Sequence, residues 1–388
     1  MVGWQTGVRP KVLLPVLVPS FCSMLFFAAP FCHRIASLIP GTRCYDGSAT
    51  VAKPQEMPNE SQIISRLRNL SRVDKRVLVG IGDDAAVIKS ADGCGERDLL
   101  ACCDLMVEGV HFRAEWAPPR LLGAKALAVN LSDIAAMGGV PKFAMVSIAL
   151  PHKFSAEYID EVFLGLFELA EASGVSIVGG DTSSSPDSFF IDVSVIGDCA
   201  SGKAITRGGA KTGDLIYVSG SLGASALGLS LLEEGLRLGD GSDFQDALVR
   251  HLNPEPPLSL GRALGEAGLA TAMIDISDGL STDLWHLLDS SKCGAVIHAC
   301  AIPIADCVRR YSPNVVTTDH LPLALNSGEE YELLFTATPE NAAKIDELSN
   351  ALVVPITCIG EVVASGELQL QTGERLEPLP PSGYEHVI

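Results

Sequence analysis

The sequence lacks the features that identify several common protein classes. It has no CxxC pair and no Cys/His cluster with zinc-ligand spacing, which excludes a structural zinc domain. It has no excess of basic residues, because 28 Lys and Arg stand against 47 Asp and Glu, a formal net charge of −19. A charge of this sign argues against nucleic acid as a partner. Phosphate ligands remain compatible with it where metal ions neutralise their charge.

A P-loop is also missing. Residues 208–212 read Gly-Gly-Ala-Lys-Thr, but Ala210 stands where the motif requires its second glycine, and a strand rather than a helix is expected to follow. Arg207, directly before this run, is a candidate phosphate clamp, because a guanidinium presents a planar fork of donors that matches phosphate oxygens.

The first 56 residues have a different character from the rest. Residues 13–30 are strongly apolar and follow Arg9 and Lys11, as in a signal peptide, yet prolines interrupt the run and argue against a membrane span. An export signal, a targeting extension and an upstream start that is not used are three interpretations. We favour the unused start, because the enzyme-like pattern begins at Met57.

Length and composition favour two domains after this extension of residues 1–56. The 388 residues exceed one ordinary domain, and 47% hydrophobic residues with 37 glycines suit a well-packed α/β enzyme. We divide the remainder into residues 57–203 and 204–388 and expect no membrane association for either. The eleven cysteines are odd in number and lie mostly in apolar runs, which indicates reduced thiols and a cytoplasmic protein.

Hydrophobic periodicity predicts alternating strands and helices in α/β or α+β layers. Expected strands are 77–79, 85–88, 98–104, 143–150, 175–178, 189–197, 215–218, 272–275 and 356–363. Expected helices are one that Asn59 caps, then 121–137, 155–173 with Ser155 as N-cap, 223–232, 244–251, 257–267, one after Gly279, and 339–350.

Acidic side chains recur beside these elements. Residues 80–87, Gly-Ile-Gly-Asp-Asp-Ala-Ala-Val, form a glycine turn between two strands, and further acids follow three other strands or interrupt the apolar helix 121–137. These acids are Asp84, Asp104, Asp133, Asp181 and Asp275. A solvated turn is the alternative for each acid, but their repetition is hard to explain in that way. Because close carboxylates repel and Mg²⁺ prefers oxygen ligands, the pattern favours a divalent metal site.

For each of two side chains, two interpretations remain open. His111 is either a donor to a ligand or a packed histidine, and on its own packing is favoured. Asp278 either caps the helix after Gly279 or faces an anion site at the N-terminus of that helix.

Six motifs resemble, in order, those of the thiamine-monophosphate kinases, which belong with aminoimidazole ribonucleotide synthetase, selenophosphate synthetase and the hydrogenase carbamoyl dehydratase. They are GIGDDAAV at 80–87, NLSDIAAMG at 130–138, GGDT at 179–182, ITRGGAKTGD at 205–214, DISDGLSTDL at 275–284 and NSGEEYELLF at 326–335. The first and third are shared across the superfamily, and the combination of the other four is specific to the kinases. The resemblance covers residues 57–388.

The resemblance implies a two-domain fold of the aminoimidazole ribonucleotide synthetase type. Its N-terminal domain, 57–203, would bind ATP and metal and pair its sheet across a homodimer, and 204–388 would form an α/β domain. The implied reaction is ATP-dependent phosphorylation of thiamine phosphate to thiamine diphosphate, the last step of its biosynthesis, with ATP as co-substrate and several Mg²⁺ ions. Implied metal ligands are Asp84, Asp104, Asp133, Asp181, Asp275, Asp278 and the backbone carbonyl of Cys103. Implied ATP contacts are Phe163, Gly180, Asp181, Arg207 and Ser277, and implied thiamine phosphate contacts are His111, Glu329 and Pro381.

Three positions depart from the family pattern. Cys102 and Cys103 stand where the family usually has Ser-Thr, so a hydroxyl ligand is lost at Cys102. Phe163 replaces a tyrosine that meets the adenine, and its ring can still stack. Pro381 stands where an aromatic residue often packs on the thiamine.

The implied chemistry agrees with the charge of the chain. Phosphoryl transfer needs positioning and charge stabilisation, and aspartates that hold Mg²⁺ reconcile an acidic protein with a polyanionic substrate. We expect Arg207 to neutralise phosphate charge, Glu329 to pair with the thiamine cation, and the substrate phosphate to attack the γ-phosphorus in line without a covalent enzyme intermediate.

Two alternatives remain open. One is another ATP-dependent synthetase of the superfamily, of the selenophosphate or aminoimidazole ribonucleotide type. The absence of a cysteine from residues 57–80 argues against the selenophosphate enzyme, which is expected to carry a reactive one there. The other alternative is a non-catalytic metal-binding protein on the same fold, against which the presence of all six implied aspartates argues.

Overall fold

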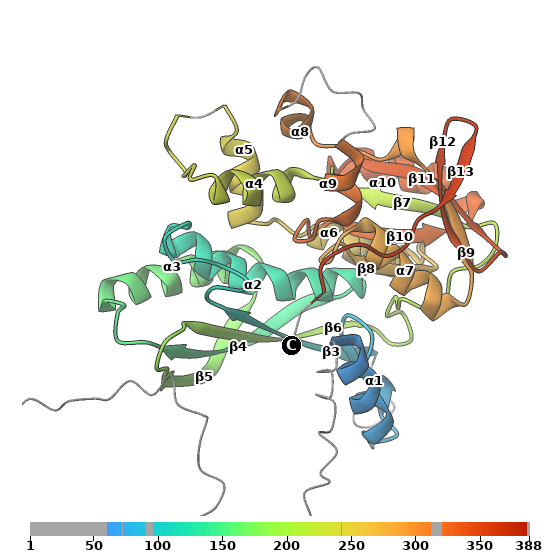
Figure 1. Ribbon diagram of the computed structural model, residues 1–388. Helices are drawn as coiled ribbons and strands as arrows, with labels where there is room; N and C mark the ends of the chain where they lie inside the picture. Colours follow the sequence, from blue (N-terminus) through green and yellow to red (C-terminus); the bar gives the residue numbers. More distant parts are fainter. Residues whose placement is uncertain (1–59, 72, 91–95, 242, 312–319, 386–388) are drawn as a thin grey trace, which may run out of the picture. The chain divides into compact units, whose positions relative to one another are not determined.

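The computed structural model describes residues 60–71, 73–90, 96–241, 243–311 and 320–385 (Figure 1). The chain divides into two units, 1–56 and 57–388, and every described residue belongs to the second. The predicted extension and the predicted cap Asn59 lie outside the described residues. None of the helices in the described ranges is both long and apolar enough to cross a membrane.

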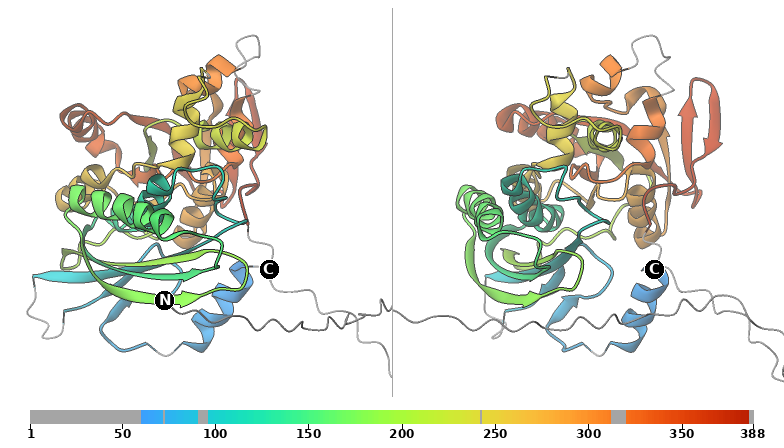
Figure 2. Two further views of the ribbon diagram at one scale, coloured as in Figure 1. Left: turned by 90° about the vertical axis from the view of Figure 1, so that its left-hand side faces the viewer. Right: turned by 60° about the vertical axis from the view of Figure 1, so that its left-hand side comes forward.

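The first of two sheets has six strands within the described residues, in the order β1-β2-β3-β6-β4-β5. These strands are β1 (Val77–Val79), β2 (Ala86–Ile88), β3 (Arg97–Val107), β4 (Val140–Leu150), β5 (Ser176–Ser184) and β6 (Phe190–Ala200). Neighbours are antiparallel except β4 and β5. Helix α1 (Glu60–Leu70) precedes the sheet, and helices α2 (Pro119–Ala136) and α3 (Ala156–Ala172) lie on one of its faces (Figure 2).

The second sheet has seven strands within the described residues, in the order β13-β12-β9-β11-β7-β10-β8. These strands are β7 (Leu215–Ser219), β8 (Ala272–Asp275), β9 (Gly294–His298), β10 (Leu333–Ala337), β11 (Ile356–Val363), β12 (Leu368–Thr372) and β13 (Arg375–Pro378). Its helices are α4 (Ala224–Glu233), α5 (Gln245–Leu252), α6 (Leu258–Ala267), α7 (Leu280–Ser291), η1 (Ala299–Ala301), α8 (Asp306–Tyr311), α9 (Leu321–Asn326), η3 (Pro339–Asn341) and α10 (Ala342–Leu352). Alternate side chains of β7 enter two different cores, Ile216 with α4 and α7, and Tyr217 with α6 and α10, so helices cover both faces.

Helix α2 connects the two halves of this unit. It is mostly apolar, and almost every residue from Leu122 to Ala136 is buried, as expected of a helix packed on several sides. Pro119 suits its first turn, where the missing N–H has no helical partner. Helix α3 packs closely on it at Gly123, where a Cβ atom would lie 1.7 Å from the carbonyl oxygen of Val162. Ala136 at its other end joins the core around α6.

The predicted elements are largely present, and several predicted strand bounds are wrong, including 189–197, which is β6 to Ala200, and 143–150, which begins at Val140. Strands 77–79 and 356–363 have the predicted bounds, and the Ser155 hydroxyl accepts the N–H of Tyr158 as the predicted cap of α3. The sequence predicts that a strand stops before Gly179, but β5 continues to Ser184, because residues 179–184 pair in parallel with β4. Strand β3 likewise runs past Asp104 to Val107, paired with β6 throughout.

Candidate active site

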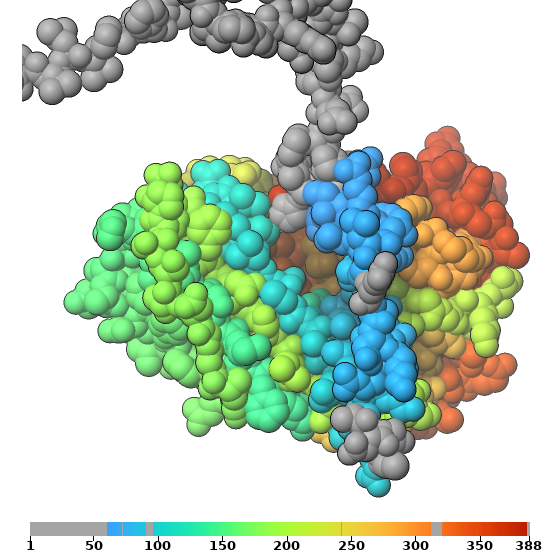
Figure 3. Space-filling view, turned by 90° about the horizontal axis from the view of Figure 1, so that it is seen from below, coloured from blue at the N-terminus to red at the C-terminus, as the bar shows by residue number. Residues whose placement is uncertain are grey.

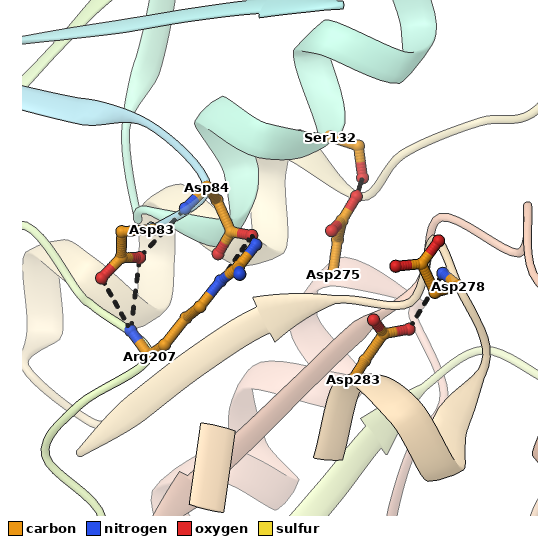
Figure 4. Close-up of polar contacts among 7 residues, drawn as sticks. All are labelled: Asp83, Asp84, Ser132, Arg207, Asp275, Asp278 and Asp283. Atoms are coloured by element: carbon orange, nitrogen blue, oxygen red, sulfur yellow. Dashed lines mark hydrogen bonds and ion pairs between the residues drawn. The ribbon is translucent and has the colours of Figure 1, made fainter. Parts of the chain in front are cut away.

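Three carboxylates from three separate segments meet at one point. Oxygen atoms of Asp84, Asp133 and Asp275 lie within 4.8 Å of one another. Asp84 comes from the turn before β2, Asp133 from α2 and Asp275 from the last position of β8. We call these three residues the acidic cluster; Figure 4 draws Asp84 and Asp275 with their neighbours. The sequence predicts all three as metal ligands, and the structure brings them together.

The turn that carries Asp84 is held from outside by α1. Gly82 has φ +113°, a conformation that favours glycine. The Arg68 side chain lies against it, at the position that a Cβ atom would take, and donates from Nε to the carbonyl oxygen of Ile81 at 2.7 Å. The glycine therefore serves both the turn and the close approach of Arg68.

Asp275 is fixed by a residue of α2. The Ser132 hydroxyl donates to Asp275 Oδ2 at 2.5 Å, and both side chains are buried (Figure 4). Ser132 directly precedes Asp133, so a single turn of α2 supplies one member of the acidic cluster and orients another.

Burial and mutual repulsion make this cluster a candidate site for a cation. Burial, followed by neighbouring carboxylates, raises the pKa of Asp133 well above its ordinary value and that of Asp275 to about 7. Asp84 Oδ2 is buried and has no hydrogen-bond partner among the described residues. Buried oxygen ligands, one of them unsatisfied, fit a hard divalent cation such as Mg²⁺.

Arg207 approaches the cluster from the loop that joins the two sheets. Its Nη2 and Nε atoms donate to Asp84 Oδ1 at 2.5 and 3.2 Å (Figure 4). Its backbone N–H lies 3.3 Å from each carboxylate oxygen of Asp83, whose pKa burial and the Asp84 charge raise to about 6. Asp83 thus anchors the backbone of Arg207, and Asp84 receives its side chain.

The segment after β8 places Asp278 near the start of α7. The N-cap position of α7 is Gly279, with no side-chain cap, so the interpretation of Asp278 as the cap is wrong. Instead Asp283 Oδ2 accepts the N–H groups of Asp278 and Gly279 at 3.1 and 2.9 Å (Figure 4). The carbonyl of Ser277 accepts the N–H of Glu329 at 2.7 Å, which ties this segment to the loop before β10.

A cavity lies further toward the N-terminus of α2. It is lined by His111, Phe112, Arg113, Trp116, Ala117, Leu122, Lys125, His251 and Leu252. Lys125 precedes Asp133 by eight residues, about 12 Å along a helix axis. Glu329 adjoins this cavity, because its carboxylate contacts Lys125 and His251. His111 accepts the N–H of Val107 at Nδ1, at 3.0 Å. The predicted substrate contacts His111 and Glu329 are therefore near each other.

Asp104 borders the cluster, whereas the Cys103 side chain points away from it. The N–H of Asp104 donates to Asn130 Oδ1 on α2 at 3.0 Å, and burial, then Asp192 and Asp84, raises the pKa of Asp104 to about 6. Successive strand residues point to opposite faces. The Cys103 thiol accordingly lies on the other face and contacts Asp192 Oδ1 at 3.0 Å.

Asp181 is not brought to the acidic cluster within one chain. Asp104 pairs in one row with Val193, Val146 and Gly180, so Asp181 is the next residue along β5 and points to the opposite face. Three strand spacings, about 14 Å, separate β3 from β5 along this row. The predicted contacts Gly180 and Asp181 thus form a separate group on an edge strand.

Phe163 and Pro381 also lie apart from the cluster. Phe163 is on α3, half-buried against the core of the first sheet, with its ring 6.4 Å from that of Phe167. The segment after Pro381 follows the first turn of α7, where Gly383 N–H donates to Thr282 Oγ1 at 2.8 Å. Tyr384 N–H donates to the carbonyl of Asp278 at 3.0 Å, so this C-terminal segment adjoins a predicted metal ligand.

Several residues around the site are missing from the sequence-based prediction. They are Asp83, Lys125, Ser132, His251 and Asp283. Lys125 carries a usable signal, since it is a cation within the apolar stretch 121–137, and Asp83, Ser132 and Asp283 belong to the quoted motifs. His251 carries none, because its place depends on how α5 packs.

Comparison with known proteins identifies the family. Residues 82–199 match the AIR synthase related protein N-terminal domain, and residues 211–373 match the corresponding C-terminal domain. Thiamine-monophosphate kinase of Buchnera aphidicola subsp. Schizaphis graminum is 39% identical over 333 residues, which cover 85% of this chain and 99% of that protein. Thiamine-monophosphate kinase of Bacillus subtilis (strain 168) is 39% identical over 313 residues, which cover 80% of this chain and 94% of that protein.

A solved structure, AaThiL complexed with AMPPCP and TMP, is 30% identical, covers 84% of this chain and 97% of that chain, and has a TM-score of 0.71. The predicted fold class of the aminoimidazole ribonucleotide synthetase type is thereby confirmed. With 39% identity over almost the whole length of a relative, the chain belongs to the thiamine-monophosphate kinase family.

Proposed function

We propose that this chain transfers the γ-phosphoryl group of ATP to thiamine phosphate and so forms thiamine diphosphate and ADP. The observation that carries the proposal is the acidic cluster of Asp84, Asp133 and Asp275 with Arg207 beside it, which four of the six motifs supply, three of them specific to these kinases in combination. The similar AaThiL, whose complex contains AMPPCP and TMP, supports a nucleotide and a second ligand for this fold.

The acidic cluster would hold Mg²⁺, with Asp104 and Asp278 as bordering ligands. A bound Mg²⁺ supplies positive charge that neutralises the phosphate oxygens. The predicted ligands Cys103, through its carbonyl, and Asp181 remain proposals, and both lie on or near the face of the first sheet that α2 does not cover.

The residues of the chain would mainly orient the two substrates and neutralise their phosphate charge. Arg207 would donate from its planar guanidinium group to a phosphate of ATP, and Ser277 would contact ATP near the start of α7. An oxygen of the substrate phosphate then attacks the γ-phosphorus in line, and the bond to the ADP oxygen breaks. No covalent enzyme intermediate is needed, because the acceptor oxygen is already anionic.

The acceptor would lie along α2. With its phosphate at the acidic cluster, thiamine phosphate would extend toward the cavity that Lys125 and His251 line. His111 and Glu329 would contact its rings there. Pro381 remains a proposed contact from the C-terminal segment.

We also propose a homodimer formed by the first sheet. Its face away from α2 and α3, which we call the outer face, exposes large apolar side chains: Leu99, Leu105, Phe143 and Met145. Figure 3 views the molecule from this side, where residues of the first sheet form part of the surface. Exposed apolar residues gathered in this way favour association with a second copy. Asp181 and Gly180 lie on the edge strand β5, so pairing would bury them together with their proposed ligand, ATP; Phe163 is proposed to meet the adenine.

Two further predictions remain proposals. Residues 57–203 and 204–388 would form the two domains, which the position of one sheet on each side of the loop 204–214 supports. A cytoplasmic location is supported by the seven cysteines of the described residues, none of which forms a disulfide.

The proposed reaction is tested by measuring ADP release from Mg·ATP with the full chain. Thiamine phosphate, free thiamine and no acceptor are compared, and the thiamine products are separated by chromatography. We expect ADP release and thiamine diphosphate in equal amounts with thiamine phosphate alone. A folded, ATP-binding protein that forms no thiamine diphosphate would refute the kinase and favour the non-catalytic alternative.

A further inference from the structure

Lys125 is a buried cation in the mostly apolar helix α2. It is 3% exposed, whereas lysine is almost never fully buried unless its charge is paired. Its Nζ atom lies 2.9 Å from Glu329 Oε1. The pair joins α2, beside the first sheet, to the loop before β10 of the second sheet. Burying two charges costs desolvation free energy that their attraction often does not recover. A gain in stability alone therefore does not explain this pair.

The other oxygen of Glu329 is held as well. His251 Nδ1 lies 3.1 Å from Glu329 Oε2, and the Ser225 hydroxyl lies 3.1 Å from the same nitrogen. Burial, together with the positive charge of Lys125, lowers the pKa of His251 to about 4, so the imidazole is neutral at physiological pH. A neutral ring donates to Glu329 when its proton is on Nδ1. Lys125 and His251 thus each contact one oxygen of the Glu329 carboxylate.

The backbone of Glu329 is fixed in a rare conformation. Its φ is +62°, in the left-handed region, and its N–H donates to Ser277 at 2.7 Å. Such conformations persist where the surroundings determine them. Burial alone would raise the pKa of Glu329, but Lys125 and then His251 lower it below its ordinary value. The carboxylate is therefore ionised and oriented, and about two of its four lone-pair sites remain for a ligand.

We propose that Lys125 is a positioning residue for the acceptor substrate: it holds the Glu329 carboxylate beside the cavity that receives the thiamine rings. This rests on the proposed function. Lys125 would not touch the reacting phosphates, because it lies about 12 Å from Asp133 along α2. The arrangement presents a fixed hydrogen-bond acceptor to the rings of the substrate, so it would favour an acceptor with N–H groups or positive charge over a plain phosphate ester.

The test replaces Lys125 by methionine, which keeps the length of the side chain and removes its charge. We expect Lys125→Met to raise KM for thiamine phosphate at least tenfold while KM for Mg·ATP changes less than twofold. Lys344→Met, the same change at an exposed position of α10, is the control and should leave both constants unchanged. Circular dichroism and thermal unfolding establish that each variant is folded.

A double variant separates positioning from general damage. Because Lys125 would act through Glu329, Lys125→Met added to Glu329→Gln should raise KM for thiamine phosphate no further than Glu329→Gln alone. Additive effects, or equal increases in both KM values, would overturn the proposal. If Lys125→Met does not fold, Lys125→Arg, which keeps the charge but changes the geometry of the contact with Glu329, gives the same comparison, and additive effects with Glu329→Gln overturn the proposal equally.

Calorimetric titration with thiamine phosphate distinguishes the two hypotheses. Wild-type protein that binds thiamine phosphate but forms no thiamine diphosphate would refute the proposed kinase only. Weaker binding by Lys125→Met would then still support the positioning role. Unchanged binding by a folded Lys125→Met, in the presence of normal wild-type turnover, would refute the role of Lys125 and leave the kinase intact.

Discussion

Arg207 and Asp84 lie 123 positions apart in the chain, yet the Arg207 guanidinium donates twice to a single oxygen of Asp84, at 2.5 and 3.2 Å. Asp84 belongs to the turn before β2 of the first sheet, and Arg207 belongs to the loop that leads to the second sheet. Although burial disfavours the cation, the Asp84 charge raises the pKa of Arg207 above its ordinary value. A permanent positive charge is thereby fixed at the acidic cluster.

The first prediction concerns the planar guanidinium group of Arg207. Because Nε and Nη2 both donate, a lysine cannot reproduce the contact with its single ammonium group. We expect Arg207→Lys and Arg207→Met each to lower kcat/KM for Mg·ATP by about 100-fold, or about 3 kcal/mol, as for a lost charge-assisted hydrogen bond. Steady-state kinetics measure this, and Arg262→Lys at an exposed ion pair of α6 is the control. Activity of Arg207→Lys close to that of the wild type would contradict the prediction.

The second prediction concerns Ser132, which donates to Asp275. In Ser132→Ala the buried Oδ2 of Asp275 loses this partner, which costs about 1–3 kcal/mol in the free energy of unfolding. Since the hydrogen bond lowers the pKa of Asp275, its loss raises that pKa, and the acidic limb of the pH–rate profile should move to higher pH. We also expect kcat to fall about tenfold, as for other residues that orient a ligand.

Denaturant unfolding and a pH–rate profile measure these effects. Ser230→Ala, at an exposed position of α4, serves as the matched control. An unshifted acidic limb in Ser132→Ala would show that Ser132 does not orient Asp275.

The sequence predicts the acidic cluster for a physical reason. Asp84, Asp133 and Asp275 each interrupt an apolar stretch, where a charge is expensive unless it serves a site. No such local signal in the sequence predicts the contacts of Lys125 and His251 with Glu329, because these contacts depend on how α2, α5 and the loop before β10 pack together. The predicted end of the strand before Gly179 is wrong for a related reason: Gly179 and Gly180 indicate a turn locally, but pairing with β4 keeps them in a strand.

The third prediction concerns Glu330, next to Glu329. Glu330 Oε1 accepts the N–H groups of Gly223 and Ser225 at 2.7 and 3.2 Å, and Oε2 is buried without a partner among the described residues. Burial raises the pKa of Glu330 to about 8 although Arg250 opposes the shift. Between the ordinary pKa and about 8 the folded state keeps a proton that the unfolded state has lost. This contribution to stability is therefore complete at low pH and is lost as the pH rises toward 8, by about 1.4 kcal/mol per pH unit.

Glu330→Gln should remove this slope, since an amide does not titrate. We expect the free energy of unfolding of the variant, relative to wild type, to increase steadily from about pH 5 to about pH 8. Denaturant unfolding at several pH values measures the difference, in which the titration of the acidic cluster cancels. Glu347→Gln, at an exposed position of α10, is the control. A difference that stays constant across this range would contradict a raised pKa at Glu330.

The fourth prediction concerns the outer face of the first sheet. Phe143 on β4 is 46% exposed there, near the exposed side chain of Met145 on the same strand. In a symmetric dimer each substitution occurs twice, so Phe143→Glu places two buried carboxylates in one interface, which water solvates better in the separate chains. We expect the variant to be monomeric at micromolar concentration by analytical ultracentrifugation, with wild-type protein dimeric. Leu376→Glu, on β13 and 50% exposed, makes the same change on the other sheet and should leave the dimer intact. A dimeric Phe143→Glu variant would place the interface elsewhere, and a monomeric wild type would refute the homodimer.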